Sequence, residues 1–364
     1  MSRPLPDFAR PDFARKGRGA LGNEVGRFEP YQREAVDDGW LSSEAELPPL
    51  RTTASIDRSR TIITRNASPD VPFDRSINPY RGCEHGCVYC FARPTHAFLG
   101  LSPGLDFETR LFYKPDAAKL LEDALHDPKY DCGVIAMGTN TDPYQPIEKE
   151  HRITRSILEV LDAHNHPVGV VTKSALVVRD IDILGRMAER GLAKVCVSVT
   201  TLERDIARTM EPRAPTPMRR IETLRRLSEA GIPTGVMAAP MIPGLTDQEM
   251  EEILSTAHDA GAQFASYILL RLPLEVADLF AAWIEAHRPE RAARVFSLMK
   301  QSRGGKIYEA KFGKRMRGSG PYAELLEKRF ELACRRIGFR EDHVALDTTA
   351  FRRPIRRGDQ MDLF

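Results

Sequence analysis

Three of the six cysteines lie within one eight-residue segment, and their spacing is the most chemically informative feature of the sequence. Cys83, Cys87 and Cys90 form a Cys-x3-Cys-x2-Cys pattern within RGCEHGCVYCFARP. Three thiolates from one short loop can ligate three irons of a [4Fe–4S] cubane, which leaves the fourth iron for a substrate. Gly82 and Gly86 permit the tight turns that such a loop needs. The pattern therefore favours an iron–sulfur site.

A structural zinc site is a second interpretation of the same loop, because His85 would add a nitrogen ligand to the three thiolates. His85 lies between the first two cysteines, where a closed tetrahedron is hard to form, and no second pair of closely spaced cysteines follows. The zinc interpretation leads to a different class of protein. It would be a nucleic-acid-binding protein, stabilised by zinc or by a cluster, without catalysis.

The other three cysteines are scattered along the chain. Cys132 and Cys196 lie in apolar strand patterns, which is typical of small buried residues. Cys334 follows a helical pattern beside two arginines, which could lower the pKa of its thiol. Cys196 and Cys334 are therefore the weak candidates for a catalytic thiol, and no catalytic residue is assigned with more certainty.

Composition places these residues in an ordinary globular chain. The 364 residues are 42% hydrophobic and 29% charged, with a net charge of +2. No apolar stretch approaches the roughly 18 residues of a membrane span. The first residues carry charges and prolines where a signal peptide needs an apolar core. We therefore expect a cytoplasmic protein without a membrane partner, with its cysteines as thiols or metal ligands.

From about residue 75, short β-branched runs alternate with helical patterns. Six such β-then-α units predict an α/β fold with a parallel sheet, either doubly wound or closed as a barrel. Thr246-x-x-Glu249 predicts a capping box at one helix start. The expected strands are Ile77–Arg81, Val134–Met137, Val168–Thr172, Lys194–Thr200, Thr234–Ala239 and Ser266–Leu270. The expected helices are Ala117–His126, Arg152–His164, Val178–Arg190, Pro217–Ala230, Gln248–Ala260 and Glu275–His287.

Four regions are expected along the chain. Residues 1–50 contain Pro, Gly, Arg and Asp without a sustained period and are predicted to be a mostly flexible leader. Residues 51–290 form the core domain, residues 291–350 a helical and basic C-terminal extension, and residues 351–364 a tail. Residues 301–364 hold 15 Lys/Arg against 9 Asp/Glu. The basic clusters at 311–317 and 352–357 would suit a phosphate backbone, although solvated loops explain the charge equally well.

The cysteine motif, with Tyr89 before its last cysteine, resembles the signature of radical SAM enzymes. The six βα units from about residue 75 to 290 resemble that family's partial (β/α)6 TIM barrel, which favours the barrel over the doubly wound sheet. The resemblance implies two cofactors, a [4Fe–4S] cluster and S-adenosylmethionine, and a reaction that produces a 5′-deoxyadenosyl radical. It also implies an electron donor, such as a flavodoxin, a ferredoxin or another reductase.

Within that superfamily, residues 70–270 resemble the spore photoproduct lyase-like group, often labelled DNA repair photolyase. The resemblance rests on the cysteine loop, on Gly138–Asp142, on Val171–Ser174 and on Val197-Ser198. It implies that Lys173 and Ser198 contact the methionyl end of the cofactor and that Tyr89 packs near the adenine. It also implies a DNA or DNA-lesion substrate, whereas the same radical chemistry on tRNA, a protein or a small molecule is the alternative.

One position departs from that group. In the lyase, a cysteine just after the second strand returns hydrogen to the product radical, and Thr139 occupies the matching position here. The O–H bond of a threonine is too strong to donate a hydrogen atom to a carbon radical. The lyase reaction would therefore require Cys132 or Cys196 as a substitute.

Further residues are candidates for cofactor binding. Radical SAM proteins usually hold the amino group of the cofactor with a Gly-Gly-Glu sequence after the second strand, and this sequence is absent. Asn140 and Asp142 offer acceptors in the same loop. Arg213, in the loop after the fourth strand, could bind a cofactor carboxylate or a substrate phosphate, or could be an exposed loop arginine.

The last five residues, Gln360-Met-Asp-Leu-Phe364, resemble the Gln-x-x-Leu-Phe peptide with which bacterial DNA-processing proteins bind the β sliding clamp. Such peptides bind as extended segments whose apolar side chains enter a preformed pocket. Gln360, Leu363 and Phe364 are the expected contacts. Docking of the tail on its own domain is the alternative.

Overall fold

The computed structural model describes residues 17–29, 50–340 and 344–354. Its main sheet has the order β10-β9-β8-β7-β6-β3-β2, and every neighbouring pair is parallel except β2 with β3. The terminal strands β10 and β2 do not pair with each other, so six parallel strands form an open, partial barrel. These strands are β3 (Arg75–Ile77), β6 (Ile135–Met137), β7 (Val168–Thr172), β8 (Ala193–Ser198), β9 (Thr234–Met241) and β10 (Phe264–Leu269), with β2 at Ile63–Arg65. The predicted α/β partial barrel is confirmed.

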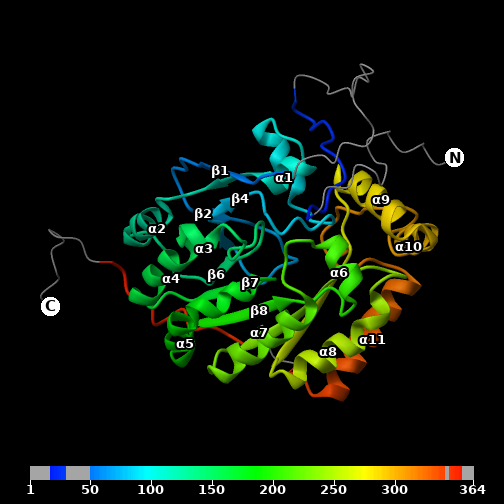
Figure 1. Ribbon diagram of the computed structural model, residues 1–364. Helices are drawn as coiled ribbons and strands as arrows, with labels where there is room; N and C mark the ends of the chain where they lie inside the picture. Colours follow the sequence, from blue (N-terminus) through cyan, green and yellow to red (C-terminus); the bar gives the residue numbers. More distant parts are fainter. Residues whose placement is uncertain (1–16, 30–49, 341–343, 355–364) are drawn as a thin grey trace, which may run out of the picture.

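Helices follow most of the parallel strands and cover the outside of the barrel (Figure 1). Valines of β7 and β8 that alternate along each strand are buried against these helices in one large apolar core. The intervening positions face the opposite side, because successive side chains of a strand alternate. The outer helices are α2 (Ala117–His126), α4 (Ile153–Ala163), α5 (Ile181–Glu189), α7 (Pro217–Glu229) and α8 (Met250–Asp259), with shorter turns at α3 (Glu148–His151), η4 (Ala175–Asp180), α6 (Arg204–Met210) and η5 (Asp247–Glu249).

Two local predictions were wrong. The expected strand Ile77–Arg81 is split into β3 and β4 (Tyr80–Arg81), because Asn78-Pro79 interrupts it and Pro79 lacks an amide donor. The expected capping box also does not form. The Thr246 hydroxyl accepts from the Ile242 amide, and Glu249 accepts from the Thr201 hydroxyl at 2.6 Å. Tertiary partners therefore use both side chains.

A second, smaller sheet contains the strands that flank the cysteine loop in the chain. Its order is β1-β5-β4, with β1 at Thr53–Ile56 and β5 at Arg110–Tyr113. Between β4 and β5 the chain forms the cysteine loop, η3 (Arg93–Leu99) and α1 (Leu105–Thr109). This excursion places the loop at the carboxyl ends of the barrel strands, where α/β barrels build their sites.

Residues 17–29 are the described part of the N-terminal region, which was predicted to be a mostly flexible leader. Residues 17–29, drawn in blue in Figure 1, pack against the excursion between β4 and β5. The amides of Gly19 and Ala20 donate to the Glu108 carboxylate, and Arg18 donates to the Glu108 carbonyl at 3.1 Å. The sequence did not show this, because the residues lack any period and their contacts are distant in the chain.

Helix α9 (Val276–His287) ends the core domain, and the C-terminal extension follows with α10 (Pro289–Gln301), a basic loop and α11 (Pro321–Ile337). Helix α11 packs on α8, where Arg329 forms an ion pair with Glu251 at 2.6 Å. The tail residues Gln360, Leu363 and Phe364 lie outside the described residues. Within the described ranges, none of the helices combines the length and apolar character of a membrane span.

Candidate active site

The backbone of the cysteine loop is held in tight turns. Gly82 and Gly86 have φ values of 73° and 69°, which L side chains rarely adopt. A Cβ on Gly86 would lie 2.7 Å from a carboxylate oxygen of Glu108. The Cys83 amide donates to the Phe107 carbonyl at 3.0 Å. The predicted role of both glycines is therefore supported by the geometry.

A fully buried ion pair between Arg93 and Glu108 holds the cysteine loop in place. The Arg93 guanidinium donates to the Cys87 carbonyl at 2.9 Å, to the Gly86 carbonyl at 3.1 Å and to the Glu108 carboxylate. Arg93 and Glu108 are both 0% exposed. Arginine suits this position because its planar group can donate several hydrogen bonds in fixed directions. The pair thus links the cysteine loop to α1 and to the N-terminal segment.

Gln145 and Arg213 also hold the cysteine loop. Gln145 accepts from the Glu84 amide at 2.9 Å and donates to the Gly82 carbonyl at 3.1 Å. Arg213 forms an ion pair with Glu84 at 2.7 Å and is not among the residues that line the pocket described below. Arg213 thus helps to hold the loop through Glu84, and its expected role as a ligand of the cofactor or the substrate stays a prediction.

Cys83, Cys87 and Cys90 all line one cavity. Burial, together with the negative charge of Asp142, raises the pKa of Cys83 well above the ordinary value, and burial raises the pKa of Cys87 to about 12. Such thiols bind a metal as thiolates, so that metal binding releases their protons. Among the described residues, no three His, Cys, Asp or Glu side chains are placed to hold a single metal ion. A cubane differs, because each thiolate binds its own iron. The donor set therefore fits the cluster better than the Cys3His zinc site.

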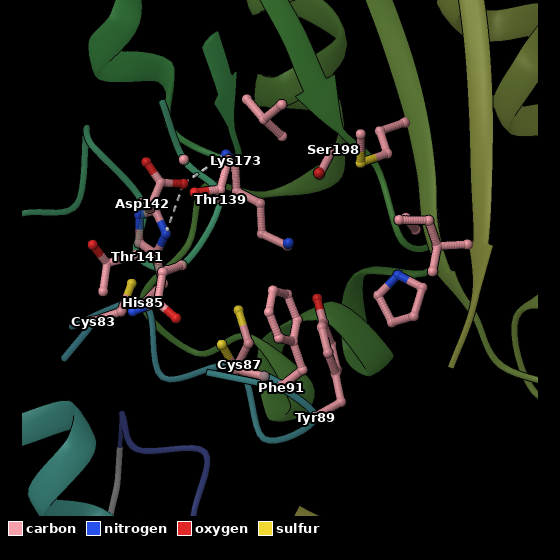
Figure 2. A pocket seen from close by; sticks show the side chains of 18 of the residues that line it. Cys83, His85, Cys87, Tyr89, Phe91, Thr139, Thr141, Asp142, Lys173 and Ser198 are labelled. Carbon is pink, nitrogen blue, oxygen red and sulfur yellow. Dashed lines mark hydrogen bonds and ion pairs between the residues drawn. The ribbon is translucent and has the colours of Figure 1, made fainter. Parts of the chain in front are cut away.

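The cavity has a volume of about 170 Å³ and opens to solvent at the carboxyl ends of the barrel strands. Besides the cysteine loop, it is lined by the chain ends of β6 to β10, so five strands contribute to it. Figure 2 shows the labelled side chains converging on it. The predicted residues Tyr89, Asn140, Asp142, Lys173 and Ser198 all line the cavity.

Lys173 extends into this cavity (Figure 2), with its Nζ 5.6 Å from the centre of the Tyr89 ring. Burial alone would lower the pKa of Lys173, but the charges of Cys87 and Glu211 raise it. No described residue forms an ion pair with this ammonium group within 4.0 Å. A charged, unpaired lysine in a cavity is suited to bind a carboxylate.

Tyr89 belongs to a buried network that holds it in place. Its hydroxyl donates to Glu211, which also accepts from Thr200 at 2.8 Å and from Arg220. Burial would raise the pKa of Glu211, but the charges of Arg220 and Lys173 lower it to about 2. Glu211 therefore stays ionised and fixes the ring that lines the cavity.

Asp142 and Asn140 differ in their partners. The Asp142 carboxylate accepts from the Thr172 hydroxyl at 2.6 Å and the Lys173 amide at 2.8 Å, and His85 Nδ1 lies 3.3 Å away (Figure 2). Burial would raise its pKa, but His85 and these hydrogen bonds lower it to about 2. Asp142 is thus occupied in joining three loops. The Asn140 side chain lines the cavity without such partners among the described residues.

The remaining candidate residues lie at different depths. Thr139 and Ser198 line the cavity. Cys196 precedes Ser198 by two residues on β8, so its side chain points to the same face but lies deeper in the barrel. Cys334 lies on α11, and burial raises its pKa to about 11, which corrects the expected lowering by its arginine neighbours. Cys132 precedes β6, at the end of the strand opposite the cavity.

Several residues of the site were not found in the sequence. Arg93, Glu108, Gln145, Glu211 and Arg220 act by positioning the loop and Tyr89, and each is at most 2% exposed. Four of them carry a charge in patterns that resemble ordinary exposed turns and helices. The only available signal was the proximity of Arg93 and Gln145 to the two predicted site loops.

Comparisons with known proteins agree with this geometry. The family model of the radical SAM superfamily matches residues 77–257. Uncharacterized protein Mb2609c of Mycobacterium bovis is 34% identical over 233 residues, which cover 64% of this chain and 68% of that protein. Uncharacterized protein MJ0683 of Methanocaldococcus jannaschii is 31% identical over 173 residues, which cover 48% and 62%.

Solved structures of spore photoproduct lyase share the fold. One of them, a mutant with bound AdoMet and dinucleoside spore photoproduct, matches with a TM-score of 0.55 and 16% identity, covering 78% of this chain and 79% of that one. At this identity the match concerns the fold alone. Together with the family match and the three cysteines at one cavity, it leads to one conclusion. The chain belongs to the radical SAM superfamily, whose members use a [4Fe–4S] cluster and S-adenosylmethionine.

Proposed function

We propose that this radical SAM enzyme acts on DNA or on a DNA lesion. The observation that supports the proposal most directly is the basic loop beside the cavity. Residues 304–317 contain five Lys/Arg and one Glu. The Leu269 amide, at the end of β10, donates to the Met316 carbonyl of this loop at 2.8 Å. Because Leu269 itself lines the cavity, positive charge lies where a polyanionic strand would approach.

The residues of the chain have distinct roles in this proposal. With both cofactors bound, reductive cleavage of S-adenosylmethionine supplies the 5′-deoxyadenosyl radical. Cys83, Cys87 and Cys90 would hold the cluster, and Lys173 would bind the cofactor carboxylate. Tyr89, fixed by Glu211, would pack beside the adenine. The lyase-like fold is consistent with a DNA substrate, although Thr139 indicates a reaction that differs in how hydrogen returns to the product.

The first experiment separates the classes of function. Protein reconstituted anaerobically would receive dithionite and S-adenosylmethionine, and 5′-deoxyadenosine would be quantified beside the Cys87→Ala variant. Product from the wild type alone is expected. An iron-free, zinc-loaded protein without product would contradict the enzyme and favour the nucleic-acid-binding alternative.

A second experiment identifies the substrate. Uniformly deuterated DNA, irradiated or not, would be added to the same reaction, and deuterium in 5′-deoxyadenosine would be measured by mass spectrometry. Abstraction from DNA transfers deuterium to the cofactor product. Transfer of deuterium to 5′-deoxyadenosine from labelled tRNA, protein or a small molecule, with no transfer from DNA, would contradict the proposal.

We further propose a cytoplasmic location, because no disulfide joins any of the six cysteines, all of which lie in the described residues.

We also propose recruitment to the β sliding clamp through Gln360, Leu363 and Phe364. The test for recruitment is deletion of residues 360–364. The deletion should abolish measurable affinity for the clamp, whereas unchanged affinity would refute this contact.

A further inference from the structure

Arg271 lies two residues after the end of β10 and lines the cavity. Its guanidinium carbon is 4.9 Å from the centre of the Phe91 ring. Its Nε is buried and donates no hydrogen bond. Among the described residues, no carboxylate forms an ion pair with Arg271. A cationic group at the wall of a cavity is thus left available for a ligand.

Arg303 adds a second positive charge beside it. Arg303 is 3% exposed and donates to the carbonyls of Leu270 and Arg315. Its Nε is also buried without a partner. Burial and the charge of Arg271 lower the pKa of Arg303 to about 10, which remains high enough for the group to be charged at neutral pH. The two guanidinium groups thus lie close enough to repel each other, and neither forms an ion pair with a described carboxylate.

The acidic residues of this region are already occupied. Asp70 accepts from the Gly313 amide at 2.6 Å and binds the Arg315 side chain. Glu309 accepts from the Lys311 amide at 3.1 Å and affects Arg303 only at longer range. Asp70 also attracts Arg271 electrostatically but forms its ion pair with Arg315. Arg271 and Arg303 therefore keep no ion pair of their own among the described residues, and an anionic ligand would relieve their repulsion.

The chemistry of the surroundings indicates which anion fits. The planar fork of arginine matches the oxygens of a phosphate group bidentately. Phe91 is 44% exposed and also lines the cavity, so its ring offers a face on which a nucleobase can stack. A peptide carboxylate could also bind the arginine guanidinium bidentately. The five cations of residues 304–317 favour a ligand with several negative charges, such as a nucleic-acid strand, over a single carboxylate.

We infer that Arg271, with Arg303 as a positioning residue behind it, binds a phosphodiester group of a nucleic-acid strand whose reactive nucleotide enters the cavity. This inference rests on the proposed function and deepens it, because it assigns the substrate's backbone to a defined subsite. Arg303 acts by holding the end of β10 against the basic loop and by adding its charge.

The test measures binding of a fluorescent 12-nucleotide thymidine strand to the reconstituted protein, by anisotropy over a range of salt concentrations. Parallel strands have an RNA backbone or a neutral methylphosphonate backbone. The variants are Arg271→Gln and Arg271→Lys. The matched control is Arg225→Gln, an exposed arginine of α7 that pairs with Glu222. Affinity for S-adenosylmethionine is measured for each protein.

The expected result is a dissociation constant for DNA that rises about tenfold in Arg271→Gln, as for the loss of a charge-assisted hydrogen bond. The slope of log K against log salt should fall by about 0.7, the value for one phosphate of a single strand. Arg271→Lys should keep the slope but lose part of the affinity. The neutral strand should bind weakly to every variant, and Arg225→Gln should match the wild type.

Other outcomes separate this inference from the proposed function. If the wild type binds DNA and Arg271→Gln binds it equally, the subsite is refuted and the DNA substrate survives. If Arg271→Gln instead loses affinity for S-adenosylmethionine, the guanidinium belongs to the cofactor site and the inference is wrong. Tighter binding of RNA supports the phosphodiester subsite while contradicting DNA as the substrate. No binding of any strand overturns both.

Discussion

Buried arginines occur in two different settings in this protein. Arg93 and Arg220 are 0% and 1% exposed, and each faces a fully buried glutamate. Arg303 is 3% exposed, and Arg271 lines the cavity, yet neither faces a carboxylate among the described residues. A buried charge is costly unless it is paired and hydrogen-bonded. The paired arginines hold the cluster loop and Tyr89, whereas the unpaired ones leave positive charge available to a ligand.

The largest effect on stability is expected when a buried ion pair is broken. Glu211→Ala would leave the charges of Arg220 and Lys173 buried without compensation and would remove the acceptor of Tyr89. The free energy of unfolding should fall by about 3–5 kcal/mol. Urea denaturation under anaerobic conditions measures it. Glu222→Gln, which removes an exposed pair, is the control and should change stability by less than about 1 kcal/mol. Equal effects would contradict the distinction.

A second change tests the geometry of pairing rather than its charge. Arg93→Lys keeps a cation opposite Glu108 but cannot donate to Cys87, Gly86, Pro103 and Gly104 as well. We expect a loss of about 2–3 kcal/mol, because buried carbonyls lose their donor. Iron bound per chain after reconstitution should fall too. Full iron content would show that the loop holds the cluster without this support.

The pH dependence of stability sharpens the same comparison. The pKa of Glu211 and that of Asp142 are lowered to about 2 in the folded protein. A carboxyl group with a depressed folded pKa stabilises the protein above its unfolded pKa and loses that contribution as the pH falls. Unfolding free energy should therefore decrease between about pH 5 and pH 2. In Glu211→Gln this slope should be smaller, whereas an unchanged slope would assign it to other carboxylates.

The smallest effect is expected from the unpaired setting. Arg271→Gln removes no hydrogen bond and no ion pair among the described residues. Its free energy of unfolding should stay within about 0.5 kcal/mol of the wild type. Thermal denaturation beside the Arg225→Gln control measures this. A loss comparable to that of Glu211→Ala would show that Arg271 has a structural partner after all.

The barrel strands could be predicted because their pattern is local. Val168–Thr172 was predicted with its exact bounds, since alternating β-branched residues and flanking helical periods mark it. The first strand was predicted wrongly, because its division at Asn78-Pro79 depends on two different pairing partners, β6 and β5. The capping box failed for a similar reason. Local propensity is overridden wherever a distant residue competes for the same side chain.

The sequence by itself determined the cysteine loop and the parallel α/β pattern, because both depend on short spacings within the chain. The barrel and the convergence of Tyr89, Lys173 and Ser198 on one site were expected from the resemblance to radical SAM enzymes. Only the tertiary structure decided which charges are paired. The sequence does not distinguish Arg213, Arg93 and Arg271. In the structure, Arg213 binds Glu84 and Arg93 binds Glu108, whereas Arg271 forms no ion pair with a described carboxylate. The partner of a buried charge is chosen by contacts between segments far apart in the chain, because only folding brings the two groups within a few ångströms.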